Sequence, residues 1–107
     1  MAAPDDEPTT HPPRFVVRDT GLSRDDLYRV LPAFLAGRPY AIDDEGVIRT
    51  PVGAGQVTIR PGPQTERRIA MLRLPAMALE FEFTGCTDSE QAAFLARFER
   101  SYQKGGG

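Results

Sequence analysis

Arginine is the residue type in this sequence that most directly suggests chemistry, because its planar guanidinium binds phosphate or carboxylate through two parallel hydrogen bonds. The chain has twelve arginines and a single lysine. Three arginines surround the glycine-containing stretch RPGPQTERR and form the predicted anion-binding set: Arg60, Arg67 and Arg68. Codon bias is the alternative explanation for the arginine excess. For the three arginines of this stretch the alternative is that their side chains are simply exposed to water, since the stretch lacks the glycine spacing of nucleotide-binding loops.

A second charged run, TERRIAMLRLPAMALEFEF at residues 65–83, alternates in the way that strands do. With a turn at residues 75–78, its two halves form a hairpin that places Arg73 opposite Glu80. The predicted inner face of this hairpin is apolar: Ala70, Leu72, Leu74, Leu79, Phe81 and Phe83. Opposite charges on a solvated outer face then account for Arg73 without any ligand.

Two apolar residues, Ile69 and Met71, fall on the solvated face of the same hairpin, beside Arg73. Apolar residues framed by charge are typical of protein interfaces, in which arginine and methionine are enriched. Ile69, Met71 and Arg73 are therefore the predicted contact set for a protein partner or for a second copy of the chain. Two alternatives stay open: long arginine side chains cover the apolar pair, or another strand register buries it.

Nucleic-acid binding is the disfavoured use of these arginines. Platforms for single strands need exposed aromatic rings between basic residues, so that bases can stack on them. Here Phe81 and Phe83 fall on the face that helices should cover, and the neighbouring Glu80 and Glu82 repel phosphate. The formal net charge is −2, without the basic excess that is usual in nucleic-acid-binding domains.

Groups suited to catalysis or metal binding are sparse, which favours a non-catalytic protein without a cofactor or metal. The only histidine, His11, lies in a predicted tail, so serine and cysteine nucleophiles lack an evident base. Cys86 precedes a predicted helix whose dipole favours a thiolate, but a lone cysteine of this kind is more often a buried small residue. The acidic run at residues 43–45 is predicted to form a turn, since it lacks the ligand spacing of a calcium or zinc site.

Features of the whole chain predict a bacterial-type cytoplasmic protein with no membrane partner. The sequence has no apolar run of the ~18 residues that a membrane helix needs. Its acidic, proline-rich start differs from a signal peptide, which is basic and then apolar. A single cysteine cannot form an internal disulfide.

The ordered domain is predicted over residues 14–104. It follows a proline-rich, acidic tail at residues 1–13 and precedes a glycine-rich flexible end at residues 105–107. Neither end has enough apolar residues to offset the loss of chain entropy on folding. The length suits one domain with one modest core.

Two helices are predicted from capping residues and apolar periodicity. The first has Ser23 as its N-cap, and Pro32 within it should cause a kink or divide it into two short helices. The second begins with a capping box formed by Thr87 and Glu90. Each helix has one narrow apolar stripe, so the pair can cover one face of a single sheet.

Between the helices the periodicity changes to two, which predicts a series of antiparallel strands after an initial strand at residues 14–19. The result is an α+β fold in the order β-α-β-β-β-β-β-α, with a curved antiparallel sheet of about five strands and two helices on one face. This order resembles helix-grip and TATA-binding-protein-like folds, in topology alone. The other face of the sheet is then solvated or meets a partner.

The leading functional hypothesis is a non-catalytic module for protein interaction that uses the open sheet face. One alternative is a small-ligand domain or minor enzyme with a pocket between sheet and helices. Six aromatic residues would line that pocket: Phe34, Phe81, Phe83, Phe94, Phe98 and Tyr102. The other alternative is weak anion or nucleic-acid binding through the three loop arginines, which added salt should weaken.

Overall fold

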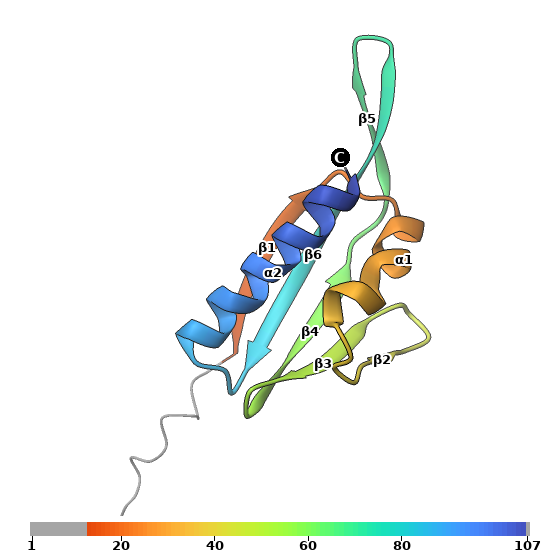
Figure 1. Ribbon diagram of the computed structural model, residues 1–107. Helices are drawn as coiled ribbons and strands as arrows, with labels where there is room; N and C mark the ends of the chain where they lie inside the picture. Colours follow the sequence, from red (N-terminus) through yellow and green to blue (C-terminus); the bar gives the residue numbers. More distant parts are fainter. Residues whose placement is uncertain (1–12, 107) are drawn as a thin grey trace, which may run out of the picture.

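The computed structural model describes residues 13–106, and Figure 1 shows the course of the chain. Its elements follow in this order: β1 (Arg14–Thr20), α1 (Arg24–Leu35), β2 (Ala41–Ile42), β3 (Ile48–Val52), β4 (Gly55–Pro61), β5 (Thr65–Ile69), β6 (Leu72–Thr84) and α2 (Asp88–Gly106). This is an α+β fold with the predicted order of strands and helices. The predicted N-terminal tail, apart from Pro13, lies outside the described residues.

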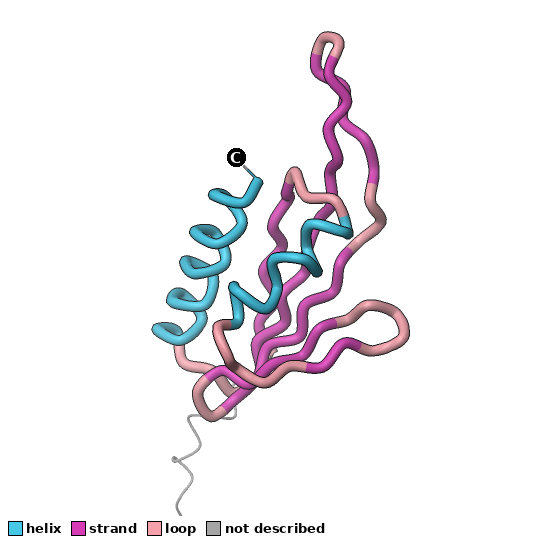
Figure 2. The backbone as a smooth tube through the Cα atoms, turned by 45° about the vertical axis from the view of Figure 1, so that its right-hand side comes forward, coloured by secondary structure: helices cyan, strands magenta, loops and turns pink. Residues whose placement is uncertain are grey.

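The six strands form a curved, open sheet in the order β1-β6-β4-β3-β2, with β5 paired to β6 alone. All of the pairings are antiparallel. β6 is thirteen residues long, so it pairs with β5 near its start and with β1 and β4 on its two sides further along. It is the strand with the most partners, and both helices lie on one face of the sheet (Figures 1 and 2).

Helix α1 begins where the sequence predicts. The Ser23 hydroxyl accepts a hydrogen bond from the backbone N–H of Asp26 at 3.0 Å, which satisfies one free donor of the first turn. The helix continues through Pro32 to Leu35 as one element, so the division into two short helices does not occur. Pro32 is exposed in the last turn, where the loss of one helical hydrogen bond interrupts little.

Helix α2 begins with the predicted capping box. The Thr87 hydroxyl accepts a hydrogen bond from the N–H of Glu90 at 3.1 Å, and the Glu90 carboxylate accepts one from the N–H of Thr87 at 2.9 Å. Further along, the Tyr102 hydroxyl donates to the carbonyl oxygen of Leu27 at 2.7 Å. Burial raises the pKa of Tyr102, so the hydroxyl keeps its proton and holds α2 against α1.

The core lies between the two helices and the covered face of the sheet. Its largest fully buried side chains come from α1 and the central strands: Phe34, Phe81, Phe83, Leu27, Leu31, Ile48, Ile59 and Leu79. The aromatic rings pack against one another, with centroids 5.1 Å apart both for Phe34 with Phe94 and for Phe81 with Phe98. The six aromatic residues expected to line a ligand pocket thus fill the core together.

The predicted hairpin with its turn at residues 75–78 is wrong. Those residues continue β6, and the chain reverses at Ala70 and Met71 instead. Proline often marks a turn, but Pro75 lies in β6 just before the strand changes partners from β5 to β1 and β4. Ala70 has a φ of 55°, a left-handed conformation that alanine seldom adopts.

Candidate functional site

Residues 65–76 form a two-stranded arm that projects beyond both helices (Figures 1 and 2). The arm consists of β5, the turn and the first part of β6, and we call the rest of the described chain the body. Residues 65–74 are all exposed, whereas the body part of β6 buries every second residue. The arm is therefore the most accessible strand pair in the described structure.

One face of the arm is apolar near its tip. Residues directly opposite each other in an antiparallel pair share a face. Ile69 lies opposite Leu72, and the next pair on the same face is Leu74 with Arg67. The three apolar members are exposed, and Met71 in the turn is 95% exposed. We call Ile69, Met71, Leu72 and Leu74 the apolar tip.

The opposite face of the arm is basic. Arg68 lies directly across from Arg73, and like charges in such a pair are destabilising. Among the ion pairs within residues 13–106, none involves Arg67, Arg68 or Arg73. Arg67 lies on the other face, opposite Leu74, and Glu66 shares the basic face with Arg68 and Arg73. Because none of the three guanidinium groups forms an ion pair in this part of the chain, they keep donors for acceptors on another molecule.

The predicted contact set lies in the arm and not on the open face of the body sheet. Ile69 and Met71 belong to the apolar tip, while Arg73 lies on the basic face. Both apolar residues are more than half exposed, so neither arginine side chains nor another strand buries them. Of the predicted anion-binding set, Arg67 and Arg68 are also in the arm.

Arg60 is separated from the other two arginines of that set by its position on β4 in the body. Its guanidinium lies 3.3 Å from Glu80 and 2.7 Å from Glu82 on the open face of the sheet. The hydrogen bond with Glu82, above all, raises the pKa of Arg60. Glu80 thus pairs with Arg60, the predicted pairing with Arg73 is wrong, and the three arginines do not form one site.

On the open face of the body sheet, two exposed apolar residues lie beside Arg60 and its two glutamate partners. Phe15 and Val17 lie on the edge strand β1, opposite Glu82 and Glu80 in register. Both are more than half exposed. The open face thus has fewer exposed apolar side chains than the apolar tip of the arm. Its two glutamates, Glu80 and Glu82, are already paired with Arg60.

Leu72 and Leu74 are the members of the tip that the sequence analysis missed. A turn at residues 75–78 would place both in the core, whereas the observed turn places both on the arm. Neither glycine nor asparagine marks the true turn, so the sequence offers no recognisable signal for it.

Cys86 is buried just before α2. Its thiol lies 3.6–3.7 Å from the carbonyl oxygens of Gln56, Val52 and Thr84. Burial, together with the nearby charge of Glu90, raises the pKa of this thiol. The thiol is therefore held in its protonated form, as in a buried structural cysteine.

The acidic run at residues 43–45 belongs to the turn between β2 and β3, as predicted. The Asp43 carboxylate accepts hydrogen bonds from the N–H groups of Val47 and Glu45, at 3.0 and 2.8 Å, and pairs with Arg49. The bond from Val47 is the main cause of the lowered pKa of Asp43. Within residues 13–106, no group of three histidine, cysteine or acidic side chains is placed to hold a metal ion.

Comparison with known proteins adds no family to this description. No protein-family model matches the chain, and neither a curated protein nor a solved structure gives a significant match. The resemblance to helix-grip and TATA-binding-protein-like folds therefore stays an analogy of topology. No helix in the described part of the chain is long and apolar enough to cross a membrane.

Proposed function

We propose that this chain is a non-catalytic protein-binding module that docks through the arm. The supporting observation is that one projecting hairpin combines the exposed apolar tip with three arginines that form no ion pair within the described residues. Exposed apolar area is unfavourable in water, and a two-stranded hairpin gains little stability by itself. A partner that covers the arm removes both disadvantages.

The chemistry of the partner follows from the two faces of the arm. The apolar tip fits an apolar groove, and the basic face fits acidic residues along one rim of that groove. Arg67, Arg68 and Arg73 can each bind a carboxylate through two hydrogen bonds. Met71 adds a flexible side chain that adapts to an irregular surface. The proposed occupant is thus an apolar groove with an acidic rim on another protein.

The arm suits a protein better than a nucleic acid. It carries no aromatic side chain that could stack on a base. The proposal also places the protein in a bacterial cytoplasm. The alternative partner is a second copy of the chain bound through the arm, and the test below distinguishes the two.

The test is a site-specific cross-link in cells. A photoreactive residue at Met71 should capture a protein, whereas the same residue at Val17 on the open face should not. The purified partner should then bind the Leu72→Ser variant at least about tenfold more weakly, because a central apolar contact is lost. Val17→Ser is the matched control, since Val17 is 58% and Leu72 60% exposed, and it should bind normally.

A shortened arm completes the test. Replacing residues 66–75 by Asn-Gly closes the hairpin at the pair Thr65 and Ala76 with a favoured two-residue turn and removes no buried side chain. This variant should keep its circular dichroism and lose the partner. Unchanged affinity for the partner would contradict the proposal, and cross-links only between copies of this chain would show a homodimer instead.

A further inference from the structure

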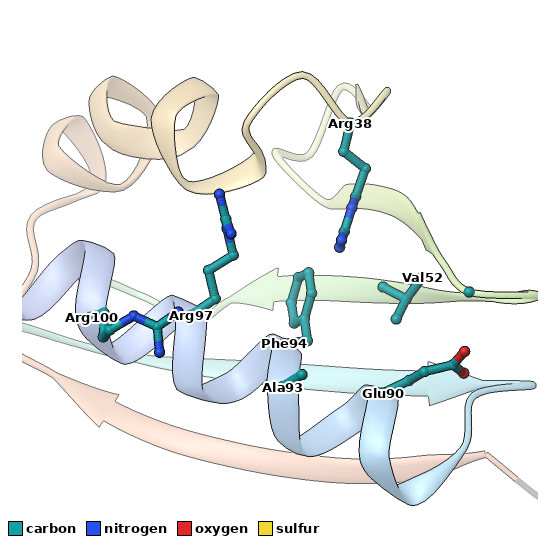
Figure 3. Close-up of a pocket in the computed structure, with 8 residues that line it drawn as sticks. Arg38, Val52, Glu90, Ala93, Phe94, Arg97 and Arg100 are labelled. Carbon is teal, nitrogen blue, oxygen red and sulfur yellow. The ribbon is translucent and has the colours of Figure 1, made fainter.

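A cleft lies between the end of α1, the helix α2 and the turn that joins β3 to β4 (Figure 3). Its volume is about 280 Å³. The side chains that decide its chemistry are Arg38, Val52, Glu90, Phe94, Arg97 and Arg100. Three arginines against one glutamate give the cleft an excess of positive charge.

Arg97 is held in place by the end of α1. Its Nε donates a hydrogen bond to the carbonyl oxygen of Phe34 at 2.8 Å. This carbonyl is in the last turn of α1, where oxygens lack helical partners. The bond engages one of the five N–H groups of the guanidinium, so the group is fixed in position while it keeps donors for an acceptor in the cleft.

Arg38 is positioned by the Phe94 ring. Figure 3 shows Arg38 reaching from the segment after α1 toward this ring, and its guanidinium carbon lies 5.6 Å from the ring centroid. A cation over an aromatic face is attracted to the ring without using its N–H groups in ordinary hydrogen bonds. Arg38 therefore also keeps donors for an acceptor.

The charges of the cleft are unbalanced. None of Arg38, Arg97 and Arg100 takes part in the ion pairs found within residues 13–106. The carboxylate of Glu90 is engaged in the capping box of α2, and in Figure 3 it points toward the Val52 side of the cleft. Three arginines that form no ion pair leave the cleft with a net positive charge, which favours the binding of an anion.

We propose that this cleft binds a small organic phosphate. A phosphate monoester carries up to two negative charges and three terminal oxygens, so it can accept more charge-assisted hydrogen bonds from the cleft arginines than the two oxygens of a carboxylate can. The organic part would lie along Gly53 and Ala93, the exposed lining residues beside the buried Val52 and Phe94, and Glu90 disfavours a second phosphate at that side. The cleft volume is just below the range of about 300–1,000 Å³ that is typical of pockets for drug-sized ligands, so the ligand is small.

Phenyl phosphate is a suitable probe, because it joins the proposed charge to an apolar group. In a titration followed by amide NMR at low salt, the amides of Gly53, Ala93 and Phe94 should shift and saturate, with a dissociation constant of about 1 mM or lower. Inorganic phosphate should bind more weakly, and phenol should give no saturable shift. Added salt should weaken the binding, since the charges are partly exposed.

Variants separate the cleft from the general charge of the surface. Arg38→Ala and Arg100→Ala should each weaken phenyl phosphate binding about tenfold, because each removes charge-assisted hydrogen bonds. Arg29→Ala is the matched control, since Arg29 is an exposed arginine of α1 that pairs with Asp26 outside the cleft. It should bind the probe as the unchanged protein does.

Three results would overturn the proposal. They are the absence of a saturable shift at the cleft amides, equal losses in the Arg29→Ala control, and benzoate binding as tight as that of phenyl phosphate. The variant with the shortened arm keeps this test independent of the proposed function. It should bind phenyl phosphate like the full chain, because the cleft includes no arm residue.

Discussion

The two halves of β6 carry similar apolar side chains in very different surroundings. In the body, Leu79, Phe81 and Phe83 are buried beneath the helices. In the arm, Leu72 and Leu74 have the same spacing but lie exposed. The exposed fractions differ because both helices lie over the body, whereas the arm extends past them (Figure 2). An apolar strand is thus a core strand only where another element covers it.

The largest difference between arm and body should appear in amide hydrogen exchange along β6. Core amides exchange near the limit set by global unfolding, about 5–15 kcal/mol for a small domain, whereas an uncovered hairpin opens at almost no cost. We therefore expect the amides of residues 79–83 to exchange orders of magnitude more slowly than those of residues 72–74. Similar protection in both halves, measured by NMR, would mean that the arm is as stable as the body.

Two leucines of the same strand sharpen the comparison. Leu79 is 0% exposed and Leu72 is 60% exposed. Leu79→Ala should lower the free energy of unfolding by about 2–5 kcal/mol, since it leaves a cavity in the core. Leu72→Ala should change it by no more than about 0.5 kcal/mol. Urea unfolding of the two variants gives both values, and equal losses would place Leu72 in the core after all.

The sequence predicts much of the body, because the signals there are local. The N-cap at Ser23 and the capping box at Thr87 and Glu90 mark the helix starts through short-range hydrogen bonds that residue type alone predicts. The inward direction of Phe81 and Phe83 is also predicted correctly, since alternation along a strand depends only on neighbouring residues.

The arm was not predictable, because its position depends on a turn that residue types do not mark. Even-numbered residues of a strand face one side and odd-numbered residues the other. Placing Leu72 and Leu74 on the same inner face as Leu79 therefore requires a turn between them, and the structure has none there.

The cleft was not predictable for another reason. Arg38 and Arg97 are distant in the sequence, and only the packing of α1 against α2 brings them together.

The turn of the arm offers a smaller test. Ala70 adopts a φ of 55°, which is unfavourable for every residue that has a Cβ atom. Ala70→Gly should therefore stabilise the hairpin by up to about 1 kcal/mol, while the unfolding of the body should not change. Slower amide exchange in the arm at a constant urea midpoint would show this. A rise in the urea midpoint would instead show that the arm and the body unfold together as one cooperative unit.

The smallest effect concerns the turn between β2 and β3, which, unlike the turn of the arm, is held by a side chain. The pKa of Asp43 is lowered in the folded state, chiefly by the hydrogen bond from Val47. Its contribution to stability is therefore present above the ordinary aspartate pKa of 3.8 and is lost as the pH falls through the lowered folded value.

Asp43→Asn should accordingly destabilise the protein slightly near neutral pH. The difference from the unchanged protein should shrink as the pH falls below 3.8 toward the lowered folded value, because the unfolded chain then binds a proton more readily than the native carboxylate does. Urea midpoints at about pH 6 and about pH 3 measure this. A difference that stays constant between the two pH values would mean that the charge of Asp43 does not stabilise the turn.

The pairing of β1 with β6 also constrains how the chain folds. Thr20 pairs with Met77 and Arg14 with Phe83, so the first strand and its partner are far apart in the sequence. During synthesis, β1 leaves the ribosome long before β6 exists, and until then it has no strand to join. Completion of this edge is therefore a late, long-range closure, of the kind that slows the folding of small domains.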